Sequence, residues 1–407
     1  MSLYDAIVVG AGPAGNITAL RLASRGHRVA VLDWRRNIGD KLCTGIIGAE
    51  CADQFPPNDS QVYHAANAAT VVSPEGRRFR IARSQPEAFI VDRVSYVNSM
   101  AGRAMDAGAE FRLGTRVTCV DVGPTDVAVT MTSEFGRTDH ARARLVVVAA
   151  GFGSPVLDMV GLGKGRGRSF MASAQAQVQV NGLEDTEVYL GDRISPGSFG
   201  WLVPLSDSMA LAGIMSQQKL NGHMDGFLQH LRNTGKVRSV VQEPKRWAIP
   251  LRPIARTFGD RVLAVGDAAG FAKPTTGGGI YYALRSGELA AEAAHLGLSN
   301  GDLSARALGV YQTRWRSLFG RELTIGYYAR RLYEALGDGQ IERLLSASAA
   351  SGLQDELINS REFAFDWHSR LILKALRPKY LGSVIRSFGP VVRPLLSRLL
   401  GPDHTAR

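Results

Sequence analysis

The chain has 407 residues, which at about 150 residues per domain indicates two or three structural units. Hydrophobic residues make up 45% and charged residues 21% of the chain, a balance that excludes a disordered, collagenous or disulfide-stapled protein. The three cysteines are too few for a disulfide framework and favour a reducing cytosol. No run reaches the roughly 18 apolar residues of a transmembrane helix, and the first strand begins too early for a signal peptide.

In chain order, the hydrophobic pattern first predicts a strand, a glycine turn, a helix and a second strand between residues 5 and 33. A helix is predicted over 94–107. Three strands are predicted over 112–121, 126–131 and 145–149.

Short alternating runs separated by turn residues predict an antiparallel sheet over 170–214. A further strand at 262–265 leads through a Gly-rich loop into a helix over 280–296, and the chain is predicted to be helical beyond about residue 304. We therefore expect an α/β fold, in which a discontinuous Rossmann-type domain is interrupted by an antiparallel substrate sheet and followed by a helical C-terminus.

A dinucleotide-binding fingerprint follows the first strand, with the sequence Gly10-Ala11-Gly12-Pro13-Ala14-Gly15. Gly10 allows a tight turn, Gly12 lets the backbone approach a pyrophosphate, and Gly15 allows close packing of helix on strand. The helix N-terminus then directs unpaired N–H groups at the phosphates. Asp33 ends the second strand, where a carboxylate binds a ribose hydroxyl. These features together predict a dinucleotide cofactor.

A second glycine-rich segment, Gly266-Asp267-Ala268-Ala269-Gly270, follows the strand at 262–265 and continues to Gly277-Gly278-Gly279-Ile280. An acid at a strand end is placed to bind sugar or ribityl hydroxyls. Glycines at a helix start expose N–H groups to an anionic oxygen, such as the one a reduced flavin carries. This segment is therefore predicted to form the second half of the cofactor site.

With Arg93, these segments resemble the FAD proteins of the para-hydroxybenzoate hydroxylase fold, and most of all the geranylgeranyl reductase family of isoprenoid-lipid reductases. Three segments carry the narrower resemblance, which covers roughly residues 3–300. Lys41-Leu42-Cys43-Thr44-Gly45 is similar to the family's Cys-Gly loop beside the flavin. The segment from Pro196 to Pro204 is similar to its Pro-x-x-Tyr-x-Trp-x-Phe-Pro substrate motif. Gly266 to Ile280 is similar to its last flavin segment.

The resemblance implies an oxidoreductase that uses FAD to saturate C=C bonds of a polyprenyl lipid by hydride transfer from reduced flavin. Phe199, Trp201 and Pro204 would contact the substrate. The fingerprint and the resemblance together imply cofactor contacts at Gly10, Gly12, Ala14, Gly15, Asp33, Cys43, Thr44, Gly45, Arg93, Val117, Gly266, Asp267, Gly278, Gly279 and Ile280. The expected domains are an FAD-binding domain in two parts, 1–165 (with substrate-domain strands near 60–92) and 258–300, a substrate domain at 166–257, and a helical region at 301–407.

The chain departs from the family pattern at two positions. Phe199 stands where the family has Tyr, so a phenol hydroxyl is absent. Ala150 stands where the fold usually has the Asp of an Ala-Asp-Gly segment that is associated with FAD and NAD(P)H binding. We therefore expect NAD(P)H to be a poor direct reductant, and an acidic carrier such as a ferredoxin to be the alternative, attracted by the net charge of +11.

Four candidate site residues have two interpretations each. Cys43 could donate a proton to an alkene, or it could be a small wall residue beside the flavin. Trp201 and Phe199 lie two apart on one strand and face the same side, where they could line an apolar tunnel or belong to the core. Arg93 could contact the cofactor or be a solvated surface residue. No HExxH motif or Cys/His cluster is present, so no metal is expected.

The C-terminal segment is basic. Residues 361–407 hold nine Lys or Arg and three acids, a surplus of six positive charges, and residues 381–400 mix apolar side chains with arginines. This pattern predicts peripheral contact with the inner face of a membrane, from which a lipid substrate would be drawn. The alternative is a terminal helix pair packed on the domain.

Two other functions remain open. The first is a flavin monooxygenase or halogenase, because Phe199 to Pro204 loosely resembles the WxWxIP motif of flavin halogenases without its first Trp. The second is a flavin-binding protein without turnover, which Ala150 supports best. Nucleic acid is not an expected partner, since the basic tail lacks a recognisable binding motif.

Overall fold

A computed structural model describes residues 3–163, 169–217, 220, 222–350, 352, 356, 359–360 and 364–375. The chain divides into two compact units, each built from three separate stretches. Unit 1 comprises Met1–Lys41, Arg93–Phe170 and Pro250–Leu323. Unit 2 comprises Leu42–Asp92, Met171–Ile249 and Thr324–Arg407.

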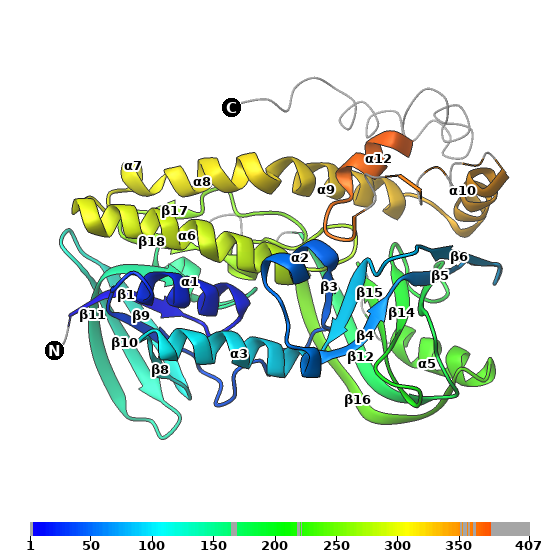
Figure 1. Ribbon diagram of the computed structural model, residues 1–407, viewed down its shortest axis with the longest axis horizontal. Helices are drawn as coiled ribbons and strands as arrows, with labels where there is room; N and C mark the ends of the chain where they lie inside the picture. Colours follow the sequence, from blue (N-terminus) through cyan, green and yellow to red (C-terminus); the bar gives the residue numbers. More distant parts are fainter. Residues whose placement is uncertain are drawn as a thin grey trace. The chain divides into compact units, whose positions relative to one another are not determined.

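Unit 1 contains an eight-stranded mixed sheet with the strand order β17-β18-β11-β1-β2-β8, to which β10 and β9 are added beyond β11 (Figure 1). Its central strands, from β18 to β8, pair in parallel, as the predicted Rossmann-type domain requires. The strands are β1 (Leu3–Val9), β2 (Val29–Leu32), β8 (Glu110–Arg112), β9 (Thr115–Val122), β10 (Val127–Ser133), β11 (Thr138–Val148), β17 (Phe258–Gly259) and β18 (Val262–Ala264).

The paired stretches of β1, β2, β11 and β18 (residues 6–9, 29–32, 145–148 and 262–264) are apolar without interruption, which suits parallel strands covered on both faces. Ile7, Val8 and Val147 are fully buried. One prediction is wrong in detail: the strand expected over 112–121 is two strands, β8 and β9. Gly114 lies between them with φ +64°, a turn conformation that ends the first strand.

Helix α1 (Pro13–Ala23) packs against both α3 (Arg93–Asp106) and α6 (Ile280–Asn300) in unit 1. The approach of α1 to α6 requires Gly287, because a Cβ there would lie 2.4 Å from Ile17 Cγ2 and 2.6 Å from the Ala14 carbonyl oxygen. Thr18 also donates to the Gly287 carbonyl at 3.1 Å. The remaining helices of unit 1 are α4 (Val156–Met159), η2 (Gly266–Ala268), α7 (Ala305–Leu308), α8 (Val310–Trp315) and η3 (Arg316–Gly320).

Unit 2 contains a seven-stranded sheet with the order β16-β12-β15-β14-β13-β5-β6 and a separate three-stranded sheet, β3-β7-β4. Strands β12, β15, β14 and β13 pair antiparallel, which confirms the sheet predicted over 170–214. The strands are β3 (Ile46–Gly48), β4 (Val62–Ala66), β5 (Ala68–Val72), β6 (Arg78–Ala82), β7 (Ala88–Val91), β12 (Phe170–Val180), β13 (Thr186–Leu190), β14 (Phe199–Pro204), β15 (Met209–Ser216) and β16 (Val237–Pro250). Two short helices, α2 (Ala49–Gln54) and η1 (Asp59–Gln61), lie between β3 and β4 in the chain.

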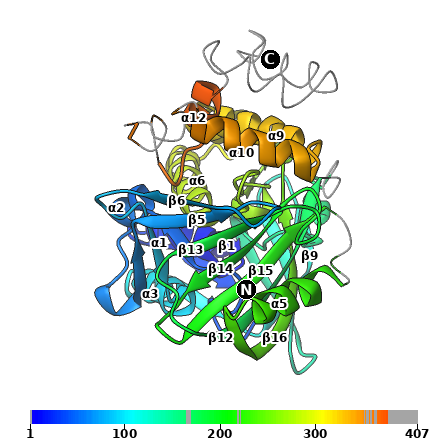
Figure 2. The ribbon, with the colours of Figure 1, turned by 90° about the vertical axis from the view of Figure 1, so that its right-hand side faces the viewer.

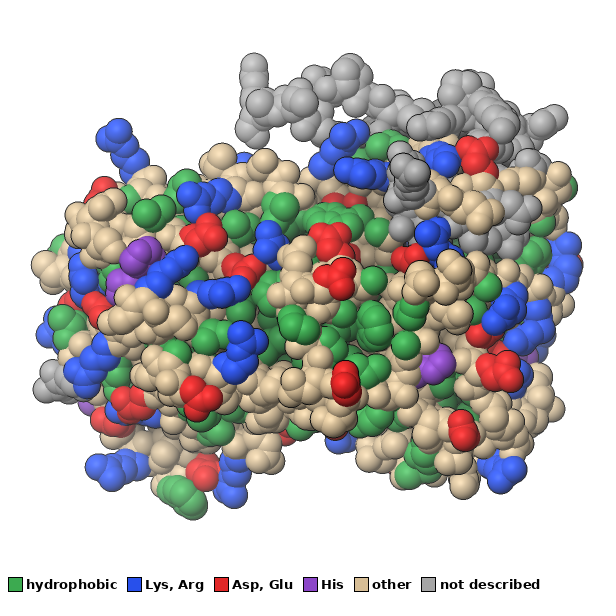
Figure 3. Space-filling view, viewed as in Figure 1, with side chains coloured by type: hydrophobic (Ala, Val, Ile, Leu, Met, Phe, Trp, Pro, Cys, Tyr) green, Lys and Arg blue, Asp and Glu red, His purple; other side chains and the backbone are tan. Residues whose placement is uncertain are grey.

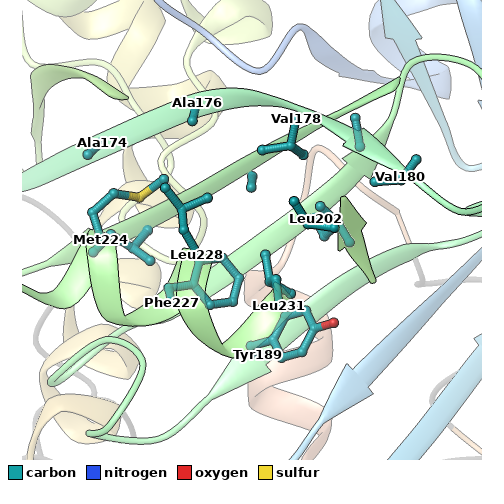
Figure 4. Close-up of a cluster of buried hydrophobic side chains, with 14 of the residues drawn as sticks. Ala174, Ala176, Val178, Val180, Tyr189, Leu202, Met224, Phe227, Leu228 and Leu231 are labelled. Carbon is teal, nitrogen blue, oxygen red and sulfur yellow. The ribbon is translucent and has the colours of Figure 1, made fainter. Parts of the chain in front are cut away.

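Helix α5 (His223–Asn233) covers one face of the large sheet (Figure 2). Phe227 and Leu231 are fully buried there with alternate residues of β12, including Ala174 and Ala176 (Figure 4). Because successive side chains of a strand point to opposite faces, Gln175 and its alternate neighbours lie on the other face of the sheet. The two faces of the sheet therefore differ: one is an apolar core under α5, and the other carries polar and aromatic side chains.

A buried carboxylate joins several parts of unit 2. Glu187 of β13 is 3% exposed and accepts hydrogen bonds from Arg78 at 2.5 Å, from Lys236 at 2.8 Å and from the Tyr189 hydroxyl. Burial raises the pKa of Glu187, but the hydrogen bonds, led by that of Lys236, outweigh it and leave the pKa below its usual range. The ionised carboxylate thus stabilises the packing of β6, β13 and the segment after α5.

The C-terminal part of unit 2 is helical in the residues described, as predicted. Helices α9 (Arg321–Glu334), α10 (Asp338–Ala350) and α12 (Ser369–Ala375) follow one another in the chain, and α9 begins within unit 1. Ile325, Leu332, Leu336 and Ile341 form a small apolar cluster between α9 and α10. No helix in the described part of the chain is long and apolar enough to cross a membrane. Residues 381–407, on which the membrane prediction rests, lie outside the described residues.

Charges of both signs are interspersed on the face of the molecule shown in Figure 3. In the described part of the chain many charges are paired, as in Arg112 with Glu110 at 2.8 Å and Arg142 with Asp126 at 2.6 Å. The surplus of positive charge is therefore not gathered into one patch on this face.

Candidate functional site

The Gly10–Gly15 turn has the geometry of a phosphate-binding turn. Gly10 has φ +116°, and a Cβ there would lie 2.3 Å from the Ala149 carbonyl oxygen, so only glycine fits. A Cβ at Gly15 would lie 1.9 Å from the Gly10 carbonyl oxygen, which explains the close approach of α1 to β1. A Cβ at Gly12, in contrast, would meet no described atom within 4 Å. The turn is therefore tight beneath and open at Gly12, where a pyrophosphate would approach the N-terminus of α1.

Asp33 holds this turn in place. Its carboxylate is 8% exposed and accepts hydrogen bonds from the Ala11 N–H and the Arg35 N–H, both at 2.8 Å. Each carboxylate oxygen has further acceptor capacity, so the predicted ribose contact is compatible with this structural role.

The second glycine-rich segment meets the first within unit 1. A Cβ at Gly266 would lie 3.0 Å from the Cβ of Ala14, and φ of Gly266 is +58°. Asp267 follows in η2, and its Oδ1 would lie 3.0 Å from a Cβ at Gly279, directly before α6. Two segments far apart in sequence thus form one side of a single site.

A lysine that the sequence analysis placed beside Cys43 pairs with Asp267. Lys41 and Asp267 form an ion pair in which both side chains are partly exposed. A second lysine, Lys273, is 3% exposed, and its Cε would lie 2.7 Å from a Cβ at Gly278. The Lys41 charge is thus paired with the Asp267 carboxylate, and the side chain of Lys273 lies beside the glycines that precede α6.

Arg93 is buried, with 8% exposure, so its interpretation as a solvated surface residue is wrong. Its guanidinium donates to the carbonyls of Gly39 and Lys41, the latter at 2.7 Å. Arg93 begins α3, and its extended side chain satisfies the carbonyls of a loop that has no regular partner strand. It thereby positions Lys41. Val117 on β9 is also buried.

Cys43, Thr44 and Gly45 belong to unit 2. Cys43 is partly buried, and its sulfur accepts a weak hydrogen bond from the Gly45 N–H at 3.5 Å. The Thr44 hydroxyl donates to Oε1 of Gln175 on β12 at 2.8 Å. This bond attaches the cysteine loop to the large sheet. Cys119 of β9 is exposed.

Trp201 and Phe199 face the same side of β14, as predicted, with ring centroids 6.0 Å apart. Trp201 is 8% exposed and also contacts Trp247 of β16, at 6.4 Å between centroids. Neither aromatic belongs to the core under α5, which Leu202 of the same strand joins. Pro204 ends β14 and is buried. The aromatic pair thus lies on the sheet face opposite α5.

Three residues of this region were missed by sequence reasoning. Gln175 accepts from Thr44 and from the Trp201 indole N–H. Arg330 of α9 donates to the Gly197 carbonyl at 2.9 Å, and the Tyr333 hydroxyl donates to the Ser198 carbonyl at 2.8 Å. The last two bonds hold the loop that begins the predicted substrate motif. The one local signal in the sequence was that Arg330 and Glu334 are four residues apart, the spacing of an ion pair on a helix, and they pair at 3.0 Å.

The predicted residues therefore fall into two sets. The described contacts bring Gly10, Gly15, Asp33, Gly266, Asp267 and Gly279 together in unit 1, and they bring Thr44, Phe199 and Trp201 together in unit 2. These residues were predicted from motifs, and their role in binding is proposed below.

The family model described as "Lycopene cyclase protein" matches residues 5–347, most of the chain. The chain belongs to this family. A curated relative named digeranylgeranylglycerophospholipid reductase 1, from Methanococcoides burtonii, is 27% identical to this chain over 96% of this chain and 98% of its own length. The predicted resemblance to the geranylgeranyl reductases is confirmed by this whole-length match.

Solved structures show the same fold. A geranylgeranyl bacteriochlorophyll reductase-like protein of Thermoplasma acidophilum superimposes with a TM-score of 0.84 at 22% identity, covering 97% of this chain and all of that one. A flavin-dependent brominase superimposes less well, with a TM-score of 0.64 at 19% identity, over 88% of this chain and 92% of that chain. The predicted fold class is confirmed, and this halogenating enzyme is the more distant of the two neighbours.

Proposed function

We propose that this lycopene cyclase family member is an FAD-dependent reductase that saturates C=C bonds of a polyprenyl lipid. The observation that carries the proposal is the union, in unit 1, of the open turn at Gly12 with the Gly266–Ile280 segment at the start of α6. The whole-length similarity to a protein named digeranylgeranylglycerophospholipid reductase supports the substrate class.

The residues of unit 1 fit FAD. The space beside Gly12 would accommodate a pyrophosphate, and Asp33 would accept a hydrogen bond from a ribose hydroxyl. Asp267 lies at the strand end where ribityl hydroxyls would be bound. The N–H groups at Gly278 and Gly279 would stabilise the negative charge that reduction brings to the flavin. Ala14, Val117 and Ile280 provide apolar contact.

Reduced FAD, when bound, supplies the hydride. An isolated alkene also needs a proton on the neighbouring carbon, and we assign that proton to the thiol of Cys43. The hydride and the proton together add two hydrogens and two electrons across one C=C bond, and the thiolate that remains regains its proton from solvent.

Phe199 and Trp201 are assigned to the lipid side. Their rings present apolar surface on the face of the sheet opposite α5, and they would exclude water from the alkene. Because Phe199 carries no hydroxyl, no proton can come from that position, and we assign the proton to Cys43 of the loop that the resemblance places beside the flavin.

An acidic one-electron carrier, such as a ferredoxin, is the electron donor we favour over NAD(P)H. Ala150 follows β11 where the fold usually has an acid, and its methyl group makes no hydrogen bond to a cofactor hydroxyl. The net charge of +11 would attract an acidic carrier. Anaerobic stopped-flow with NADPH, NADH and reduced ferredoxin measures this preference, and rapid bleaching by either nicotinamide would contradict it.

Peripheral contact with the inner face of the membrane is proposed through the basic segment 381–407. It is supported by the composition of that segment and by the need to take a lipid substrate from a bilayer.

The test is product mass. The purified protein is loaded with FAD, reduced anaerobically with dithionite, and mixed with a geranylgeranylated glycerol ether lipid in detergent. Reduction adds two hydrogens for each bond saturated, and the flavin is reoxidised without oxygen. A cyclisation, as the family model's description suggests, would leave the mass unchanged, and an oxygenation would require oxygen and add its mass. A flavin that stays reduced in the presence of the lipid would indicate a binding protein without turnover.

A further inference from the structure

Gln175 occupies a singular position on the sheet face opposite α5. It is 3% exposed, and its Oε1 accepts two hydrogen bonds, from the Thr44 hydroxyl at 2.8 Å and from the Trp201 indole N–H at 3.3 Å. One oxygen therefore joins the cysteine loop to the aromatic strand β14. Thr44 lies 131 residues before Gln175 in the sequence, and Trp201 lies 26 residues after it.

The orientation of the Gln175 amide is decided by chemistry. An indole N–H only donates, so the atom that faces Trp201 must be the amide oxygen. A carbonyl oxygen has two lone pairs, which allows it to accept from Thr44 at the same time. Neither of the two bonds uses the amide nitrogen.

Two neighbours bound the Trp201 ring in addition to this bond. A Cβ at Gly213 of β15 would lie 2.3 Å from Cζ2 and 2.5 Å from Cε2 of the indole, so the ring fills the space that glycine leaves. The contact with Trp247 adds a further boundary. If Gln175 lost its oxygen, the indole N–H would be buried without an acceptor, which strongly favours a change in ring position.

We propose that Gln175 is a positioning residue. It fixes the position of Trp201 and of the loop that contains Thr44 and Cys43, so that these residues are correctly placed for the reacting alkene. This inference rests on the proposed reductase function. Gln175 acts through its two partners, so its loss should reduce turnover while reduction of the bound flavin continues.

The test compares Gln175→Met, which keeps side-chain length without the amide, with Gln177→Met on the same face of β12. In Gln175→Met, we expect kcat for the isoprenoid lipid to fall about 10- to 100-fold, the range of one buried hydrogen bond and its unpaired donor, with little change in KM. The rate of flavin reduction by dithionite should be unchanged. Gln177→Met should match the wild type in all three measurements.

Two further measurements distinguish positioning from general damage. The chain has five tryptophans, so ¹⁵N-tryptophan spectra show few indole N–H signals, and Trp201→Phe assigns one of them. That signal should shift in Gln175→Met and stay in Gln177→Met. Thr44→Val should lower kcat less in the Gln175→Met background than in the wild type, since the shared acceptor is already gone.

If Gln175→Met does not fold, the double variant of Gln175→Met with Trp201→Phe is measured instead, because it removes the buried indole donor together with its acceptor. Its kcat should then lie below that of Trp201→Phe alone, because the Thr44 hydroxyl has still lost its acceptor. A wild-type kcat in Gln175→Met with an unmoved Trp201 signal, or additive effects with Thr44→Val, would overturn the inference. Absence of hydrogenated product from the wild-type protein would instead refute the proposed function.

Discussion

Gly12→Ala separates folding from cofactor binding. Gly12 has φ −81° and ψ −178°, an extended conformation that alanine adopts without strain. A Cβ there would meet no described atom within 4 Å. Replacing glycine by alanine at such a position stabilises a protein by about 0.4–1 kcal/mol, because the unfolded chain loses freedom. The free energy of unfolding of the apoprotein should therefore be unchanged or raised by up to about 1 kcal/mol.

The same methyl group occupies the space that the pyrophosphate would use. If it removes one or two charge-assisted hydrogen bonds from the N-terminus of α1, each of about 1.5–3 kcal/mol, the Kd for FAD should rise at least about tenfold. Quenching of flavin fluorescence on titration measures the Kd, and urea unfolding of the apoprotein measures stability.

Gly10→Ala is the matched control. Gly10 has φ +116°, and its Cβ would lie 2.3 Å from the Ala149 carbonyl oxygen, so this variant should lose about 1–3 kcal/mol of stability or more before any ligand is added. A wild-type Kd in Gly12→Ala would refute the placement of the pyrophosphate. A destabilised Gly12→Ala apoprotein would refute the open space beside it.

Three further perturbations test other parts of the molecule. Glu187→Gln removes the anion that Lys236 faces, and should cost about 1–3 kcal/mol of unfolding free energy at pH 7, less than for fully buried pairs because its cationic partners are partly exposed. Because the pKa of Glu187 lies below its usual range, this contribution is complete above about pH 4.3 and is lost as the pH falls through the folded-state pKa. In urea unfolding, the difference in free energy of unfolding between the wild type and Glu187→Gln should be smaller at pH 3 than at pH 7. Equal differences at the two pH values would contradict this. Cys43→Ser should retain FAD but lose about 10²–10⁴-fold in turnover, whereas full activity would leave only the wall interpretation. Deletion of residues 381–407 should reduce flotation with anionic liposomes, and unchanged flotation would exclude a membrane role for that segment.

The glycine-rich turns show how far local sequence reaches. Gly10, Gly12 and Gly15 each have a distinct steric reason, and the structure gives each the surroundings that its place in the fingerprint implies. The central strands were recognisable because parallel strands covered on both faces are continuously apolar. The turn at Gly114 was missed, because a single glycine in a β-rich run is compatible with either a β-bulge within one strand or a turn between two strands.

The site residues divide differently. The types and chain positions of Asp33, Asp267 and Cys43 could be predicted because their motifs are short and local. The bond between Lys41 and Asp267 spans 226 residues, and no local pattern indicates it. Arg93 was singled out as a cofactor contact, which stays a prediction; its partners in the structure include two carbonyls of an irregular loop, which a sequence does not display.

By itself, the amino-acid sequence determined the secondary structure of most of the chain, the glycine turns and the residue types that a flavin and an apolar chain require, because these follow from neighbours within a few residues. Only the tertiary structure decided that Gln175 joins Thr44 to Trp201 and that Gly213 makes room for the indole. On β12, Gln175 alternates with apolar residues as Gln177 does, and nothing in the strand distinguishes the two. The difference arises from which strands and loops pack beside each one, a long-range outcome of folding that local spacing does not encode.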